Sequence, residues 1–510
     1  MPDIVTFWKR RLAGAKRTAA SERPGWLAGV STIPGFVEPK LSVVEGDPEH
    51  ARLLIIAAPG AVGKSSFASA VAAATNSVLV DLAKTDPLGG NFFTGGLSRA
   101  FGLDTPSAAV RGEIGLVVDA LDEAQMRATP EGFEAGLLDL AEIAKAPDAL
   151  PIVLLGRGLA AEDAYLLLST KGFEACLLTV EFFTDDQAAQ YLRSKLPLVA
   201  ARSEKVASAY RGHGPRFLEL AEQAHAKLKE VAGSDQARFA GYAPVLDAIC
   251  EFTLEADGLN PQLKIANLRA TNQIELIDDI TISILERERG KLRDQFRERH
   301  AEATPQTLDT LYTVEDQLQL VASNLFGLNE PPLPELPKEA YYTTYKEMVD
   351  QFGPQHPFLT ANGVASNPVF AAYVVAWALR KSGQADLVRK AVVAKPNVMS
   401  GIFFDLYQRE LESEKNPIMP LADVGVLYQA LSAKIDHNRM TQDERGVALV
   451  NALVEDKILE LFDSQKFYRL DQDEMARKLR VSYHDLALSR FTAECDSYLI
   501  SVLSRIRVGR

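Results

Sequence analysis

One short segment near the N-terminus, LLIIAAPGAVGKSSF at 53–67, constrains the fold more than any other part of the chain. An unbroken apolar run, a turn that contains Gly60 and Gly63, and an Ala-rich helical pattern follow one another directly. An unbroken apolar run is typical of a strand buried on both faces, and an immediate helix is typical of a parallel α/β sheet. The segment therefore predicts a strand, a tight loop and a helix that packs back onto the sheet.

The loop in this segment matches the phosphate-binding pattern G-x-x-x-x-G-K-[ST], except that Ala58 stands at the first glycine position. Glycines let the backbone bring its N–H groups close to a phosphate, and the following helix presents its positive end to the anion. Lys64 would neutralise the β- and γ-phosphates, and Ser65 would place its hydroxyl on Mg²⁺. The predicted nucleotide-binding residues are Pro59, Gly60, Ala61, Val62, Gly63, Lys64, Ser65 and Ser66.

Further apolar runs alternate with helical patterns as far as residue 181. The predicted strands are Leu53–Ala58, Val78–Leu82, Ile114–Asp119, Ile152–Leu155 and Cys176–Val180. Buried strands separated by helices indicate a mostly parallel sheet that is covered on both faces. We therefore predict a five-stranded, parallel α/β domain over residues 51–181.

Acidic residues follow the third predicted strand, in the segment IGLVVDALDEA. Mg²⁺ bound to nucleotide needs one or two carboxylates, which makes Asp119 the candidate metal ligand together with Ser65. A further acid can orient or deprotonate the attacking water, so Asp122 and Glu123 are candidate catalytic residues. Arg157 ends the next strand and could reach the γ-phosphate. With Lys64, these residues form the predicted catalytic set.

These motifs together resemble the signal-transduction P-loop NTPases of the STAND class, and within it the NACHT subgroup. The resemblance rests on the Ala58–Ser65 loop, the element Val118–Glu123, the strand ending in Arg157 and the later Gly212-His-Gly-Pro215, and it spans roughly residues 36–380. The second motif of the subgroup has a small residue after the first acid and then a paired Asp-Glu. Ala120 and the acids that follow it match that pattern.

The resemblance implies an AAA+/STAND-like P-loop domain followed by a helical lid, a winged-helix-like element and an all-α C-terminal region. In the family, a lid proline contacts the nucleotide base, and Pro215 occupies that position. A winged-helix histidine often touches the β-phosphate of ADP, and Asn367 occupies that position here. Both residues are therefore predicted nucleotide contacts, although the substitution of Asn for His leaves the second alignment open.

For function, the resemblance implies a switch that is closed with ADP, opens with ATP and Mg²⁺, and hydrolyses ATP slowly. The open form of such proteins assembles into homo-oligomers, and bacterial members often act in defence against phage. Members carry a sensor and an effector, yet no protease, nuclease or TIR signature is evident in this chain. We therefore expect a separate effector or sensor protein as a partner.

Changes of pattern along the chain predict its domain boundaries. Residues 1–50 combine basic residues with a Pro- and Gly-containing stretch and are interpreted as a lead-in segment. Helical patterns fill 182–330, starting from a cap at Thr184. The Pro-rich segment 329–339 indicates a linker before a winged-helix-like element at 331–385, whose apolar residues 369–379 predict a core helix. Residues 386–510 are predicted to form a C-terminal helical domain.

Composition narrows the class and the compartment. Lys+Arg 55 against Asp+Glu 68 gives a net charge of −13, which argues against binding nucleic acid or anionic membrane through bulk charge. The three cysteines, Cys176, Cys250 and Cys495, are too few and too dispersed for a disulfide framework or a metal cluster. No apolar run is long enough for a signal peptide or a membrane span. We expect a cytoplasmic protein with no membrane partner.

Two other functions fit the same residues. An AAA-type remodelling ATPase would use the same loop and acids, with an arginine from a neighbouring subunit completing each site. A DNA-binding regulator is the other alternative, because residues 471–490, DQDEMARKLRVSYHDLALSR, resemble a helix-turn-helix with Arg480 in place of the usual turn glycine. An ordinary helical hairpin explains this last pattern equally well, so nucleic acid binding stays open. The sequence does not distinguish ATP from GTP.

Overall fold

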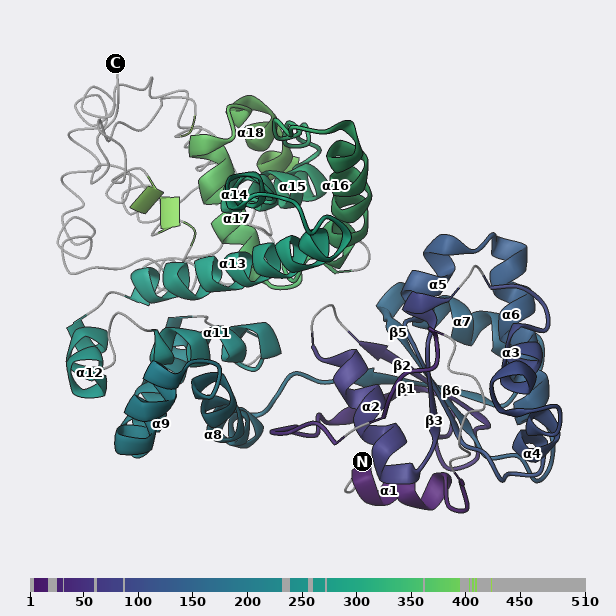
Figure 1. Ribbon diagram of the computed structural model, residues 1–510. Coiled ribbons are helices and arrows are strands. Elements are labelled where there is room, and N and C mark those ends of the chain that lie inside the picture. Colours follow the sequence, from purple (N-terminus) through teal and green to yellow (C-terminus); the bar gives the residue numbers. More distant parts are fainter. Residues whose placement is uncertain are drawn as a thin grey trace, which may run out of the picture. The chain divides into compact units, whose positions relative to one another are not determined.

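The chain forms two compact units (Figure 1). The computed structural model describes residues 4–16, 25–30, 32–58, 62–85, 88–231, 239–255, 260–270, 273–360 and 363–394, with positions 403, 406, 407, 409, 410 and 423. The first unit holds the described residues of 1–229, 237–270 and 360–362, and the second holds those of 230–236, 271–359 and 363–510. The predicted helix-turn-helix at 471–490 lies outside the described residues.

A six-stranded sheet forms the centre of the first unit. Its strands are β1 (Leu41–Glu45), β2 (Leu53–Ala58), β3 (Val78–Asp81), β4 (Leu116–Asp119), β5 (Ile152–Arg157) and β6 (Ala175–Val180). They lie in the order β1-β6-β2-β5-β4-β3, with β2 to β6 parallel and β1 antiparallel beside β6. The carboxyl ends of the parallel strands therefore lie at one end of the sheet.

The prediction of a mostly parallel sheet is confirmed, and its parallel strands lie at or close to the predicted positions. The predicted number of strands is wrong, because β1 adds a sixth strand. In β1 only Leu41 is buried, and the strand ends in exposed residues. An edge strand with this burial pattern produces no continuous apolar run, so its sequence gives little signal.

Helices α1 (Ile4–Arg11) and α2 (Lys64–Thr75) cover one face of the sheet (Figure 1). Trp8 of α1 is buried and meets Phe67 of α2 edge to face, with the ring centroids 6.3 Å apart. Both rings belong to the core that also contains Leu54 and Ile56 of β2. The segment interpreted as a lead-in thus contributes a helix and a strand to the first unit.

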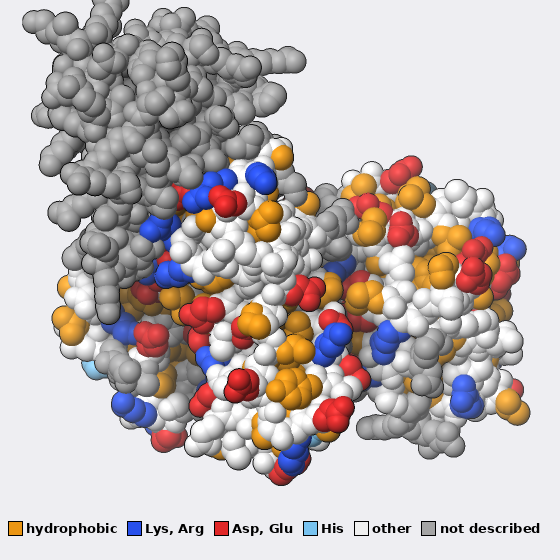
Figure 2. All heavy atoms as spheres, turned by 90° about the horizontal axis from the view of Figure 1, so that it is seen from above, with side chains coloured by type: hydrophobic (Ala, Val, Ile, Leu, Met, Phe, Trp, Pro, Cys, Tyr) orange, Lys and Arg blue, Asp and Glu red, His pale blue; other side chains and the backbone are white. Residues whose placement is uncertain are grey.

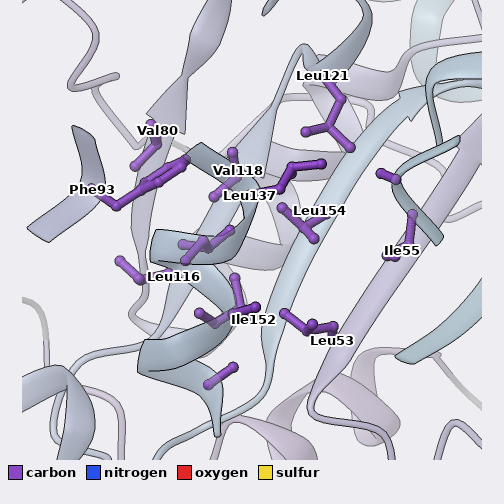
Figure 3. Packing of buried hydrophobic residues seen from close by; sticks show 14 of the residues in the cluster. Leu53, Ile55, Val80, Phe93, Leu116, Val118, Leu121, Leu137, Ile152 and Leu154 are labelled. Carbon is purple, nitrogen blue, oxygen red and sulfur yellow. The ribbon is translucent and has the colours of Figure 1, made fainter. Parts of the chain in front are cut away.

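The other face of the sheet is covered by α3 (Phe92–Phe101), α4 (Thr105–Val110), α5 (Leu121–Arg127), α6 (Pro130–Ala144) and α7 (Gly158–Thr170). A short 3₁₀ turn, η1 (Leu82–Lys84), follows β3. Successive strand residues point to opposite faces, so β2 buries Leu53 and Ile55 here. Figure 3 shows these two side chains in the core with Leu121 of α5 and Leu137 of α6.

Helices α8 (Asp185–Ala200), α9 (Glu204–Val231), α11 (Ala243–Leu254) and α12 (Pro261–Ala270) complete the first unit. As predicted, α8 begins after Thr184, whose backbone N–H donates to Oε1 of Gln187 at 3.0 Å in a capping box. α9 is kinked at His213, where φ is −135° and ψ is 20°. Pro215 follows two residues later, and proline removes a helical hydrogen bond and bends the backbone.

The second unit contains α13 (Gln273–Arg299), α14 (Pro305–Asp309), α15 (Val314–Phe326), α16 (Glu339–Phe352), a 3₁₀ turn η4 (Gly353–Gln355), α17 (Pro368–Lys381) and α18 (Ala385–Ala394). All residues of 369–379 are buried, which confirms the predicted core helix. The Pro-rich segment 329–339 lies within this unit. Its Leu336 is buried in a core that includes Leu292 and Phe296 of α13 and Tyr341 of α16.

On the face shown in Figure 2, the described acidic and basic side chains are interspersed rather than gathered by sign. Among the described residues, no helix has both the length and the apolar composition needed to cross a membrane.

Candidate functional site

The predicted phosphate loop leads from the end of β2 into α2. Residues 59–61 lie outside the described part of the chain, whereas Val62, Gly63, Lys64, Ser65 and Ser66 are described. Gly63 has φ 87° and ψ 31°, a left-handed conformation in which a Cβ would be strained. This turn lets α2 begin at Lys64, immediately after the loop. The N–H groups of the first helical turn lack partners in the helix and can bind an anion.

Lys64 forms an ion pair with Asp122. The Nζ atom lies 2.7 Å from Oδ1 of Asp122, and the two side chains are only 11% and 10% exposed. Asp122 is in the first turn of α5, which follows β4. The pair therefore joins the first turn of the phosphate-loop helix to the element that follows the acidic strand.

Asp119 ends β4 and lies beside Ser65 of α2. Burial raises the pKa of Asp119 above its ordinary value, and a hydrogen bond with Ser65 and the charge of Lys64 offset this only in part. In the described structure, Oδ1 of Asp119 has no hydrogen-bond partner. A buried carboxylate oxygen with unused acceptor capacity next to a hydroxyl suits a hard cation such as Mg²⁺. Among the described residues, no group of three or more His, Cys, Asp or Glu side chains is placed to hold a metal ion, so other oxygens would have to complete the coordination.

The turn between β4 and α5 places the two remaining acids. Ala120 is left-handed, with φ 70° and ψ 42°, and α5 begins at the next residue. Asp122 and Glu123 thus fall in the first turn of the helix, where its dipole favours negative charge. Even so, burial and then the negative charge of Asp122 raise the pKa of Glu123. A carboxylate with a raised pKa is a better proton acceptor near neutral pH than an ordinary one.

Arg157, at the end of β5, contacts the same Asp122. Its Nε lies 3.0 Å from Oδ2 of Asp122, an ion pair by distance rather than an aligned hydrogen bond, and its backbone N–H donates to Oδ1 at 3.1 Å. Burial alone would raise the pKa of Asp122, but the positive charges of Lys64 and Arg157 and the Lys64 hydrogen bond lower it below its ordinary value. The structure thus brings Lys64, Asp122 and Arg157 into direct contact.

Two residues at this end of the sheet were not predicted. A Cβ on Gly156 of β5 would lie 2.9 Å from the Cβ of Leu121, so glycine is needed for α5 to pack this closely. The sequence signal was a glycine in an otherwise apolar strand, which often marks a close backbone approach. Asp81 ends β3 in register with Asp119. It accepts a hydrogen bond from the N–H of Ala83 at 3.1 Å, and its pattern resembled an ordinary turn acid.

A small hollow adjoins the described part of the phosphate loop at Val62. Residues of the segment before β1, of the end of β6 and of the turn before α11 line it, namely Pro39, Val62, Val180, Glu181, Phe182, Phe183, Gly241 and Ala243. Pro215 is exposed on α9 and is not among these described lining residues. Its contact with a nucleotide base stays a prediction.

Asn367 belongs to the second unit, where it caps α17. Its Oδ1 accepts a hydrogen bond from the backbone N–H of Val369 at 2.8 Å. The side chain is buried, and within the described residues its Nδ2 has no hydrogen-bond partner. The predicted contact between Asn367 and a nucleotide stays a prediction.

Comparison with known proteins adds no relative: no protein-family model matches the chain, and no curated protein matches its sequence.

Proposed function

We propose that the first unit is a P-loop NTPase that binds ATP with Mg²⁺ and hydrolyses it slowly, as a switch of the STAND/NACHT type. One observation carries the proposal. Lys64 and Ser65 at the start of α2, Asp119 at the end of β4, Glu123 in α5 and Arg157 at the end of β5 are gathered at one end of a parallel sheet. Ligands of open α/β sheets bind at the carboxyl ends of the strands.

The residues suggest a division of roles. Residues 59–66 and the positive end of α2 would hold the phosphates, with Lys64 neutralising their charge. Ser65 and Asp119 would hold Mg²⁺, which supplies charge neutralisation at the phosphates, and the unused Oδ1 of Asp119 supports this assignment. Glu123 would take the proton of the attacking water.

The switch requires that the γ-phosphate shift the population between a closed and an open state, by several kcal/mol for a complete change. Helices α8, α9 and α11 follow β6 after a short connection, in which the N–H of Phe183 donates to the carbonyl of Gly241 at 3.0 Å. This connection borders the hollow at Val62. A nucleotide on the phosphate loop would therefore lie close to the hinge of the proposed lid. The resemblance to NACHT proteins favours a cytoplasmic protein that forms homo-oligomers when it binds ATP. It also favours a role in antiphage defence that is carried out with a separate effector protein.

Mass analysis of the purified full chain, before and after addition of ATP and Mg²⁺, tests this function by measuring bound nucleotide and assembly size together. We expect about one nucleotide per chain, retained ADP in the monomer and a larger species with ATP. A protein that binds no nucleotide would refute the proposal. A stable ring with rapid, continuous turnover would support the remodelling ATPase instead.

A further inference from the structure

We propose that Asp122 is a positioning residue that orients Arg157 for the terminal phosphate, and that it does not abstract the proton of the attacking water. The inference rests on the proposed function and divides the roles of two adjacent carboxylates. The sequence motif does not separate them, because both lie in the same turn after β4.

Contacts made by Asp122 are the first argument. Oδ1 is 2.7 Å from Nζ of Lys64 and accepts the backbone N–H of Arg157 at 3.1 Å, while Oδ2 lies 3.0 Å from Nε of Arg157. Both hydrogen bonds fall on Oδ1, and Oδ2 faces Nε of Arg157 as an ion pair, so both oxygens are turned toward the two cations. A general base must instead direct a lone pair at the water it deprotonates. The geometry suits holding a cation better than accepting a proton.

The form of the Arg157 contact is the second argument. Asp122 meets both the backbone N–H and the side chain of Arg157, so one carboxylate fixes the start of the side chain and its guanidinium. An arginine side chain loses rotamer entropy when it is fixed on a phosphate, and part of that loss has already occurred before nucleotide arrives if the side chain is held. Gly156 permits this contact, because it lets Leu121 and the start of α5 pack against β5.

Charge gives the third argument. The side chains of Lys64 and Arg157 are 11% and 9% exposed, and Asp122 lies between them. Two largely buried cations repel each other strongly unless a carboxylate compensates them. Asp122 therefore allows both cations to occupy the strand end where the phosphates are proposed to bind.

A double-mutant cycle tests this role. The measured quantity is the ratio of the affinity for a non-hydrolysable nucleoside triphosphate to the affinity for the matching diphosphate, both from calorimetry. The nucleotides carry adenine or guanine, whichever base the wild type binds more tightly. We expect Asp122→Asn and Arg157→Ala each to lower the ratio about tenfold, and the double variant to lower it no further. Gln125→Ala, on the same helix but hydrogen-bonded to Asp163 at 2.9 Å, is the control and should keep the wild-type ratio.

Several results would overturn the inference. Independent, multiplicative losses in the double variant would show that Asp122 does not act through Arg157, and so would a wild-type ratio in Asp122→Asn. If Asp122→Asn does not fold, Arg157→Lys replaces it, because lysine keeps the charge but not the planar guanidinium; an unchanged ratio there would also overturn the inference. A wild-type protein that binds neither nucleotide would refute the proposed function itself. If the wild type binds the diphosphate and one of the results above is obtained, only the role of Asp122 is refuted.

Discussion

Gly156 and Leu121 occupy adjoining space so closely that a Cβ on Gly156 would lie 2.9 Å from the Cβ of Leu121 and 3.4 Å from its Cδ1. Real Cβ atoms do not approach to 2.9 Å, so either β5 or α5 would have to move. Asp122 follows Leu121 directly and contacts Arg157, the residue after Gly156. The packing of an apolar pair therefore determines the distance between two charged residues of the candidate site.

Gly156→Ala should displace α5 and weaken both stability and nucleotide binding. Overpacking a close-packed site costs about 1–3 kcal/mol, which we expect as loss of unfolding free energy in urea. Gly158→Ala is the matched control, because a Cβ there would meet nothing closer than Oε1 of Glu162 at 3.9 Å. Equal behaviour of the two variants in unfolding and in nucleotide titration would contradict this explanation.

Lys64→Ala should weaken nucleotide binding severely. Charge-assisted hydrogen bonds contribute about 1.5–3 kcal/mol each, so the affinity should fall by roughly 10- to 100-fold or more in calorimetric titration. Lys84→Ala removes a lysine near the same end of the sheet, where Nζ of Lys84 pairs with Asp81 at 3.0 Å, and should leave the affinity unchanged. Wild-type affinity in Lys64→Ala would exclude the phosphate loop as the binding site.

Glu123→Gln should keep nucleotide binding and slow hydrolysis by about 10²- to 10⁴-fold, the usual contribution of a general base. Glu123 can accept a proton only when it is deprotonated. Because burial and the charge of Asp122 raise its pKa, the wild-type rate should rise as the pH passes through that raised value. Single-turnover rates over a pH series measure both effects. The variant should lose this rise, and a retained pH profile would assign the base to another group.

Asp119→Asn should stabilise the protein near neutral pH while weakening Mg²⁺-dependent nucleotide binding. Burial raises the pKa of Asp119 in the folded state, so folding is favoured by its proton. That contribution is fully present below the ordinary carboxyl pKa and is lost as pH rises through the raised value. Replacing this buried carboxylate by a neutral amide should raise the unfolding free energy by roughly 0.5–2 kcal/mol.

Urea unfolding of Asp119→Asn at several pH values measures this gain, with the exposed Asp148→Asn as control. A gain that grows between acidic and neutral pH is the expected result. Equal stability changes in the two variants would mean that burial of Asp119 imposes no cost.

The parallel strands could be predicted because each is a continuous apolar run, as in Leu53–Ala58, and burial on both faces requires that composition. Strand order could not be predicted, because no local pattern states which strands become neighbours. The contact of Asp122 with Arg157 depends on that order, since it needs β5 beside β4. Asp122 was therefore identified as a site residue from its motif, while its partners came only from the fold.

The left-handed Ala120 offers a last test, by two substitutions with opposite backbone consequences. At φ 70°, an L-residue strains the folded state by about 1–2 kcal/mol, and glycine avoids this strain. Glycine also gives the unfolded chain more conformational entropy, which lowers the unfolding free energy by about 0.4–1 kcal/mol. Ala120→Gly should therefore leave the unfolding free energy nearly unchanged or slightly raised. Ala124→Gly, four residues on in the helical part of α5, has no such strain to relieve and should lose about 1 kcal/mol. Equal losses in urea unfolding of the two variants would show that the turn after Asp119 is not strained.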